Sequence, residues 1–163
     1  MHSIPDVKTI LYATALGQHS RPVFRYAISL ARQYNAKIIF LHVVEPLSNE
    51  ARAVIETYMS VEAADRAQKD NMQQVLEEIK VRLDKFCTEE MESCKTDVSK
   101  VREILVASGD PSEEILRIAD KQKVDLIVMG KSTGSFFGST VMGSVSRRVT
   151  RQAKVPVLVV PNY

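Results

Sequence analysis

The chain has little of several features that point to particular classes of protein. Its 163 residues include two cysteines, carry a net charge of only +2, and contain no apolar run near the roughly 18 residues of a membrane-spanning helix. The 22 basic and 20 acidic side chains are spread along the sequence, so we expect neither nucleic acid nor a membrane as a partner. The first ten residues lack the charged and apolar blocks of a signal peptide, which indicates a cytoplasmic protein.

The two cysteines predict no metal site and no disulfide. Cys87 and Cys94 lie seven residues apart in helix-like sequence, a separation of about 10 Å along a helix axis, which is too long for a disulfide within one helix. No Cys-x-x-Cys pair and no neighbouring histidine completes a set of zinc ligands. We therefore expect two free thiols.

The composition that remains is that of an ordinary globular protein. Apolar residues make up 45% of the chain and charged residues 26%. A chain of this length can bury one core well but is short for two, so we predict a single domain over residues 1–163.

Strand-like and helix-like segments alternate along the sequence. Apolar runs predict strands at residues 7–14, 37–44, 99–107, 125–129 and 155–160. Between them we expect a helix capped by Ser20, a long helix over 50–92 with a break near Ser60, a helix that begins at the capping box Asp110-Pro111-Ser112-Glu113, and a last helix over 144–153. Strands joined through helices run parallel, so the sequence predicts an α/β fold with a five-stranded parallel sheet and helices on both faces.

The long helical segment carries one apolar stripe. Its members recur at helical spacing and are Met72, Val75, Leu76, Ile79, Leu83 and Phe86. We interpret the whole stripe as the face that covers the sheet rather than as a docking site for a partner helix.

The last strand contains a proline, which restricts its place in the sheet. Pro156 lacks a backbone N–H, so this strand belongs at an edge. An apolar edge strand needs cover, and we expect a homodimer through Val155–Val160. The alternative is an edge shielded by a terminal tail.

The most informative segment is residues 125–144. An apolar run ends at Gly130, a stretch rich in Gly, Ser and Thr follows, and helix-forming sequence resumes at Gly143. A helix N-terminus offers unpaired backbone N–H groups and partial positive charge, and glycines let a phosphate approach the main chain. We therefore predict a phosphate-binding loop that meets the loop after the first strand at the carboxyl edge of the sheet. His19 lies close enough to this predicted pocket to touch a ligand.

Five short segments, in order, closely resemble the universal stress protein family. They are Ile10-Leu11 through Ser20, Leu41-His42-Val43-Val44-Glu45-Pro46, Gly109-Asp110-Pro111, Met129-Gly130 with Gly143-Ser144-Val145, and Val155-Pro156-Val157-Leu158-Val159-Val160. The resemblance covers nearly the whole chain. It implies a Rossmann-like (adenine nucleotide alpha hydrolase-like) fold, usually dimeric, with one branch of the family that binds ATP or AMP and another that does not.

The resemblance also assigns candidate binding residues. Nucleotide-binding members carry a pattern of Gly, two residues, Gly, nine residues and then Gly followed by Ser or Thr, and this chain has Gly130, Gly143 and Ser144 at the first, third and fourth positions. Thr133 stands at the second position, with Gly134 one step late. By resemblance, the backbone of Val43 faces the adenine and the Gly130 and Gly143–Val145 segments hold the phosphates. The full predicted site is Thr14, Ala15, Val43, Met129, Gly130, Lys131, Thr133, Gly134, Gly143, Ser144 and Val145.

The first strand departs from the family pattern. Nucleotide binders usually carry an Asp near the adenosine, and alignment through Thr14 places Ala15 there. A charge-assisted hydrogen bond contributes about 1.5–3 kcal/mol, so its loss costs roughly ten- to a hundredfold in affinity. The many hydroxyls of the loop still offer donors to a phosphate, and millimolar cellular nucleotide would offset a loss of this size.

Three interpretations of function remain open. The first is a dimeric stress-response module that binds ATP or AMP, with Mg²⁺ accompanying ATP. The second is a non-nucleotide-binding family member that acts as a structural or interaction dimer, with Phe136 and Phe137 as an anchor for an unknown protein partner. The third is phosphoryl transfer, which we do not expect, because residues 131–142 contain no Asp, Glu or His to hold a metal or orient the attacking group. We predict no catalytic residues.

Overall fold

The computed structural model describes residues 3–16, 19–131 and 141–161. Its strands are β1 (Thr9–Ala13), β2 (Lys37–Val44), β3 (Val101–Ser108), β4 (Leu126–Gly130) and β5 (Val157–Val160). Its helices are α1 (Ser20–Tyr34), α2 (Asn49–Glu56), α3 (Val61–Ser93), α4 (Pro111–Gln122) and α5 (Ser144–Gln152), with a short 3-10 helix at Val98–Lys100 before β3. Among the described residues, no helix is both long enough and apolar enough to cross a membrane.

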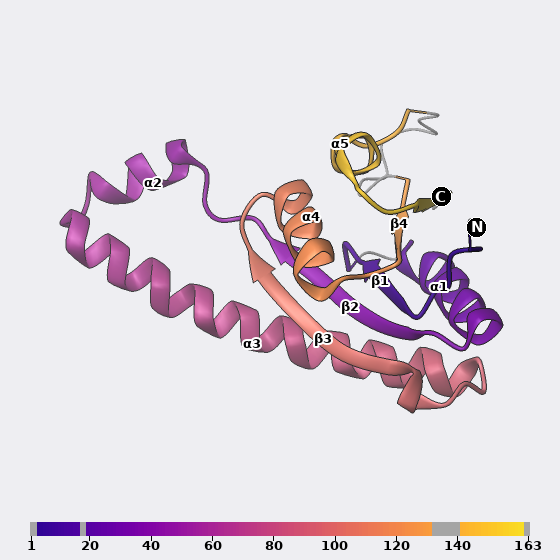
Figure 1. Ribbon diagram of the computed structural model, residues 1–163. Helices are drawn as coiled ribbons and strands as arrows, with labels where there is room; N and C mark the ends of the chain where they lie inside the picture. Colours follow the sequence, from indigo (N-terminus) through magenta and orange to yellow (C-terminus); the bar gives the residue numbers. More distant parts are fainter. Residues whose placement is uncertain (1–2, 17–18, 132–140, 162–163) are drawn as a thin grey trace.

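The strands form one five-stranded parallel sheet, as the sequence predicts, and the structure gives their order as β3-β2-β1-β4-β5. β1 lies in the middle, and Tyr12 is in register with Phe40 of β2 on one side and Val128 of β4 on the other. The chain builds outward from β1 to β3 and then crosses over to build β4 and β5 on the other side (Figure 1). Ligand sites of open parallel sheets lie at such a reversal of strand order, beyond the carboxyl ends of the strands.

Two apolar cores lie on the two faces of the sheet. Successive residues of a strand point to opposite faces, so Tyr12 and Phe40 belong to the core under α1 and α3, whereas Leu11 and Leu41 belong to the core under α4 and α5. The first core contains Phe24, whose ring centroid lies 4.6 Å from that of Phe40. Helices on both faces confirm the predicted arrangement.

The helix starts agree with the sequence at two positions and differ at one. Asp110 caps α4 by accepting a hydrogen bond of 2.9 Å from the Glu113 N–H, and Ser60 caps α3 by accepting one of 3.2 Å from the Ala63 N–H. The expected break near Ser60 is therefore confirmed. The predicted cap at Ser20 is wrong by one residue, because His19 is the N-cap of α1 and Ser20 already belongs to the helix.

β3 and β5 begin later than the sequence predicts. Residues 99 and 100 belong to the short 3-10 helix, and the Ser99 N–H donates a hydrogen bond of 2.8 Å to the Asp97 carboxylate, a local turn bond that competes with strand pairing. β5 starts after Pro156, whose carbonyl accepts a hydrogen bond from Ile127. β5 pairs with β4 alone among the described strands, which confirms its place at an edge.

The interpretation of the long helix as a cover for the sheet is wrong for its first half. Leu83 is buried against the sheet, but Val75 is 38% exposed, and Met72 and Leu76 are half-buried. α2 and the first half of α3 extend beyond the strands (Figure 1), and we call residues 49–80 the arm. Of the stripe residues in the arm, Ile79 still packs against the core under α1 and α3, whereas Met72, Val75 and Leu76 lie further along the helix and are not among the residues packed there.

Candidate functional site

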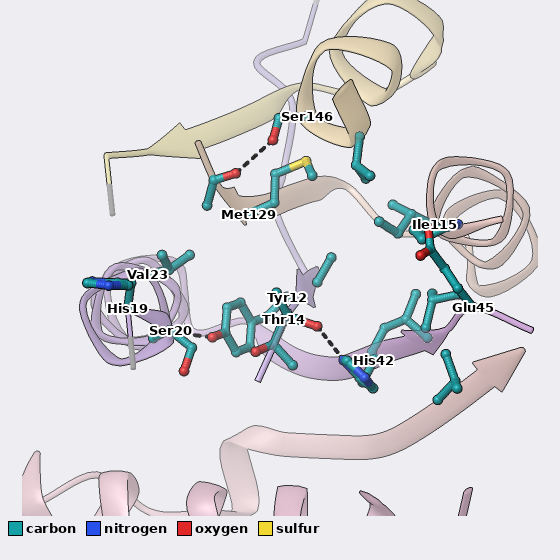
Figure 2. A pocket seen from close by; sticks show the side chains of 18 residues that line it. Tyr12, Thr14, His19, Ser20, Val23, His42, Glu45, Ile115, Met129 and Ser146 are labelled. Carbon is teal, nitrogen blue, oxygen red and sulfur yellow. Dashed lines mark hydrogen bonds between the residues drawn. The ribbon is translucent and has the colours of Figure 1, made fainter. Parts of the chain in front are cut away.

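A cavity of about 360 Å³ opens at the carboxyl edge of the sheet, at the reversal of strand order. Its walls come from the ends of β1, β2 and β4 and from the first turns of α1, α4 and α5 (Figure 2). The residues after β1 therefore meet the end of β4 and the start of α5 at one place, at the edge of the sheet that the alternation of strands and helices predicts.

On the β1 side, hydrogen bonds hold the backbone after the strand. The His42 Nδ1 lies 2.7 Å from the Thr14 carbonyl O (Figure 2). A carbonyl oxygen only accepts hydrogen bonds, so Nδ1 carries the hydrogen in this contact. The Leu16 N–H donates to the Thr14 Oγ1 at 3.2 Å, and Leu16 adopts a left-handed conformation with φ of 58°. The chain therefore turns sharply past Ala15 at the cavity wall.

The floor of the cavity contains a buried tyrosine. The Tyr12 hydroxyl donates a hydrogen bond of 3.0 Å to the Ser20 carbonyl O at the start of α1 (Figure 2). Burial raises the pKa of Tyr12 well above its ordinary value, so the hydroxyl stays protonated and keeps this donor. Tyr12 thereby connects β1 to α1, and Val23 of this helix and its N-cap residue His19 line the same cavity.

The β4 side is built around the N-terminus of α5. Gly143 is its N-cap, and no described side chain caps this helix end. The Gly143 N–H donates to the Lys131 carbonyl O at 2.9 Å, and the hydroxyl of the buried Ser146 lies 2.9 Å from the Gly130 carbonyl O. Val145 and Ser146, from the first turn of α5, line the cavity with Gly130. A helix N-terminus at a cavity favours an anionic ligand.

The structure brings together six of the residues predicted for the site. Thr14, Ala15, Val43, Met129, Gly130 and Val145 all line the cavity. Lys131, Gly143 and Ser144 lie next to it in the chain but are not among its lining residues. Thr133 and Gly134 lie outside the described residues, as do Phe136 and Phe137. The assignment of these residues to a ligand stays a prediction.

Several lining residues were not on the predicted list. They include Tyr12, Ser20, His42, Glu45, Ile115 and Ser146. A strand residue such as Tyr12 resembles ordinary core in sequence. Ser146 lies two residues after the predicted Ser144. Helical spacing places the two serines on different sides of α5, and this spacing could have pointed to Ser146 as the one that faces β4.

Asp110 and Glu45 are acidic side chains beside and at the cavity. No group of three or more His, Cys, Asp and Glu side chains among the described residues could hold a metal ion. Asp110 near the cavity is occupied as a helix cap, and its hydrogen bonds with Ser112 and the Glu113 N–H hold the pKa of its carboxyl below the ordinary range. Glu45 at the rim is exposed, as expected of a solvated turn residue.

Comparison with known proteins assigns this chain to a family. Residues 6–161 match the family model of the universal stress protein family. The chain belongs to the universal stress protein family. Among its relatives, the universal stress protein MJ0577 of Methanocaldococcus jannaschii is 27% identical over 157 residues, which cover 94% of each chain. A universal stress protein of Thermus aquaticus is 30% identical over 153 residues, which cover 94% of this chain and 98% of the relative.

Solved structures of universal stress proteins share the Rossmann-like α/β fold of this chain. The structure of MJ0577 superposes with a TM-score of 0.73 at 24% identity and covers 98% of this chain and 99% of its own. A universal stress protein in complex with cAMP gives a TM-score of 0.58 at 22% identity, with 96% and 98% covered. The universal stress protein of Archaeoglobus fulgidus in complex with dAMP gives a TM-score of 0.51 at 18% identity, with 94% and 96% covered.

Proposed function

We propose that this universal stress protein binds an adenine nucleotide, ATP or AMP, in the cavity at the carboxyl edge of β1, β2 and β4. The observation that carries this proposal is the position of the α5 N-terminus, which opens on the cavity without a side-chain cap among the described residues. The cavity of about 360 Å³ falls in the range of roughly 300–1,000 Å³ typical of small-molecule sites. Relatives of the same fold bound to cAMP and dAMP support an adenine nucleotide as the ligand class.

The cavity has two ends of different chemistry, which suit the two ends of a nucleotide. Gly130, Val145 and the α5 N-terminus would hold the phosphates, because backbone N–H groups and the helix dipole favour negative charge there. At the other end, Val43 would offer backbone groups to the base, beside the apolar side chain of Ile115. Mg²⁺ would be carried by the phosphates of ATP, since no described cluster of side chains could bind it alone.

We further propose that the protein acts by binding, as one domain over residues 1–163 in the cytoplasm, and not as an enzyme. The described side chains at the cavity offer no set of metal ligands for phosphoryl transfer. A bound nucleotide would change the shape and charge of the surface that the protein presents at this edge of the sheet.

The proposal is tested by thermal unfolding with increasing ATP, AMP and, as a control, GTP. A ligand at about 100 times its Kd stabilises the folded state by about 2.7 kcal/mol, so the melting temperature should rise with concentration for ATP or AMP. Native mass spectrometry of freshly purified protein should show the bound nucleotide. No shift at millimolar ATP or AMP would refute the proposal.

A substitution at the β1 end makes the test sharper. Ala15 lines the cavity, and the family resemblance places an Asp at this position in nucleotide binders, so Ala15→Asp should tighten ATP binding by roughly tenfold or more. Val141→Asp, also exposed but not a lining residue, is the matched control for added charge. Equal effects of the two variants would show that the gain does not come from the cavity.

We also propose a homodimer through β5. This edge strand carries an apolar Val-Leu-Val-Val sequence, and such an edge pairs readily with a second copy. Native mass spectrometry of Leu158→Lys should then report a monomer where the wild type is a dimer. A wild-type monomer would refute the dimer without affecting nucleotide binding.

The arm favours a second function, capture of a protein partner. Three large side chains of the arm are exposed where α2 turns into α3. Their exposed fractions are 60% for Val54, 85% for Tyr58 and 52% for Val61. Replacing Tyr58 with Ser should abolish partner capture and leave nucleotide binding unchanged, whereas loss of both activities would argue against separate roles.

A further inference from the structure

A buried serine ties the start of α5 to the end of β4. Ser146 is 2% exposed, and its hydroxyl oxygen lies 2.9 Å from the Gly130 carbonyl O (Figure 2). The same oxygen lies 3.0 Å from the Lys131 carbonyl O. A serine inside a helix usually donates to a carbonyl of its own helix, one turn back. Ser146 instead reaches across to a strand that ends 16 residues earlier in the chain.

Backbone hydrogen bonds surround this contact. The Gly143 N–H donates to the Lys131 carbonyl O at 2.9 Å, and the Lys131 N–H donates to the Val160 carbonyl O of β5 at 2.8 Å. We call Gly130, Lys131, Gly143 and Ser146 the neck. The neck brings together the two ends of the chain segment that leaves β4 and returns at α5.

Ser146 adds side-chain hydrogen bonds to the backbone hydrogen bond of the neck. The Gly143–Lys131 bond joins the two ends at one point, and the completely buried Val149 anchors α5 to the core further along the helix. The Ser146 hydroxyl lies between these two points and holds the first turn of α5 against the end of β4. The first turn of α5 therefore faces the cavity at a set angle.

We propose that Ser146 is a positioning residue, which through its hydroxyl holds the α5 N-terminus where a nucleotide phosphate would bind. The ligand part of this inference rests on the function proposed above, whereas the holding of the neck does not. Ser146 itself lines the cavity, but its hydroxyl hydrogen is directed to the strand carbonyls, so its effect on the ligand passes through the helix.

The matched variants are Ser146→Ala and Thr150→Val. Both remove one hydroxyl from α5, but the Thr150 hydroxyl donates to the Ser146 and Arg147 carbonyls of its own helix. Affinities for ATP, AMP and adenosine are measured by calorimetry. Ser146→Ala should raise the Kd for ATP and AMP by about tenfold and that for adenosine by less than about twofold, because adenosine has no phosphate. Thr150→Val should leave all three values within about twofold.

The comparison with adenosine separates positioning from general loss of structure. If Ser146→Ala weakened ATP and adenosine equally, or weakened neither, the assignment to the phosphate end would be overturned.

Amide hydrogen exchange of the ligand-free protein tests the neck without any nucleotide. Ser146→Ala should speed exchange of the Gly143 and Lys131 amides by about fivefold or more, with the amides of β1 and β2 unchanged, and Thr150→Val should not. Unchanged exchange at Gly143 would overturn the inference. If wild-type protein binds neither ATP nor AMP, the proposed function fails and the phosphate role of Ser146 with it, while the exchange result still decides whether Ser146 holds the neck.

Discussion

The two halves of α3 show that one continuous helix can be held in two different ways. Its second half, residues 81–93, buries Leu83 and Met91 completely and carries the buried carboxylate of Glu90. Its first half belongs to the arm, where α2 is the neighbouring helix and Arg52 bonds to Asp65 and Gln68. The second half is held by apolar burial against the sheet, and the first half by polar contacts, a helix cap and partial burial.

The difference implies that stability is distributed unevenly along α3. Helices are stabilised mainly by packing of an apolar face, and local opening is easiest where buried contacts are few. The arm should therefore open far more often than the second half, although the two share one hydrogen-bonded helix. Frequent local opening of the arm is compatible with the protein-binding surface proposed there.

The largest effect is expected from Leu83→Ala. Leu83 is completely buried in the core under α1 and α3, so the variant should lose about 2–5 kcal/mol of unfolding free energy through lost burial and the cavity that remains. Urea unfolding followed by circular dichroism measures the loss. A value below about 1 kcal/mol would mean that the second half of α3 is not held by the core.

A smaller loss is expected from Glu90→Gln. The buried Glu90 carboxylate accepts a hydrogen bond of 3.2 Å from the Arg25 Nε and forms an ion pair at 3.3 Å with the Arg21 Nε, both on α1. Because both arginines are more than half exposed, solvent screens the pair, and we expect a loss of about 1–2 kcal/mol. Urea unfolding at low and at 1 M salt measures it, with the Arg25→Gln variant and the double variant completing a cycle. Additive losses would show that the two side chains do not interact.

Ser60→Ala tests whether the halves open separately. The variant removes the cap bond to the Ala63 N–H, which contributes about 1 kcal/mol, so amides of residues 63–68 should exchange about fivefold faster. Amides of residues 83–91 should keep their rates. Equal acceleration along the whole helix would show that α3 opens as one unit, contrary to the comparison.

The smallest effect is expected from Val81→Ala. Val81 is 68% exposed on the solvent side of the second half, two residues from Leu83. We expect its unfolding free energy to change by less than about 0.5 kcal/mol, because no buried contact is lost and alanine favours the helix. Thermal unfolding beside Leu83→Ala measures both. A loss as large as that of Leu83→Ala would mean that burial does not distinguish the two positions, contrary to the comparison.

Local sequence signals predicted most of the elements. The caps at Asp110 and Ser60 were visible because one side chain satisfies a nearby N–H, and such a contact needs no distant partner. The prediction of Ser20 as the cap was wrong because serine, which favours cap positions, also fits the first turn of a helix. In the structure Ser20 lies in that turn, and its carbonyl accepts a hydrogen bond from the Tyr12 hydroxyl. The prediction that the whole apolar stripe of α3 covers the sheet was wrong because periodicity shows which face of a helix is apolar but not how far the sheet extends.

The sequence predicted those lining residues of the cavity whose position follows from the course of the backbone alone. Gly130 and Val145 line the cavity because they follow a strand and begin a helix, which the sequence pattern shows. Tyr12, His42 and Ser146 were missed because their contacts join residues 8 to 28 positions apart, across strand ends that only the folded sheet brings together.

By itself the sequence determined the alternation of strands and helices, the parallel sheet and the edge position of β5, because these depend on periodicity, on crossover connections and on one missing N–H at Pro156. Only the tertiary structure decided which half of α3 is buried, which hydroxyl closes the neck and which side chains form the cavity floor. Those outcomes depend on where the sheet ends in space, and neighbouring residues in the chain carry no information about that boundary.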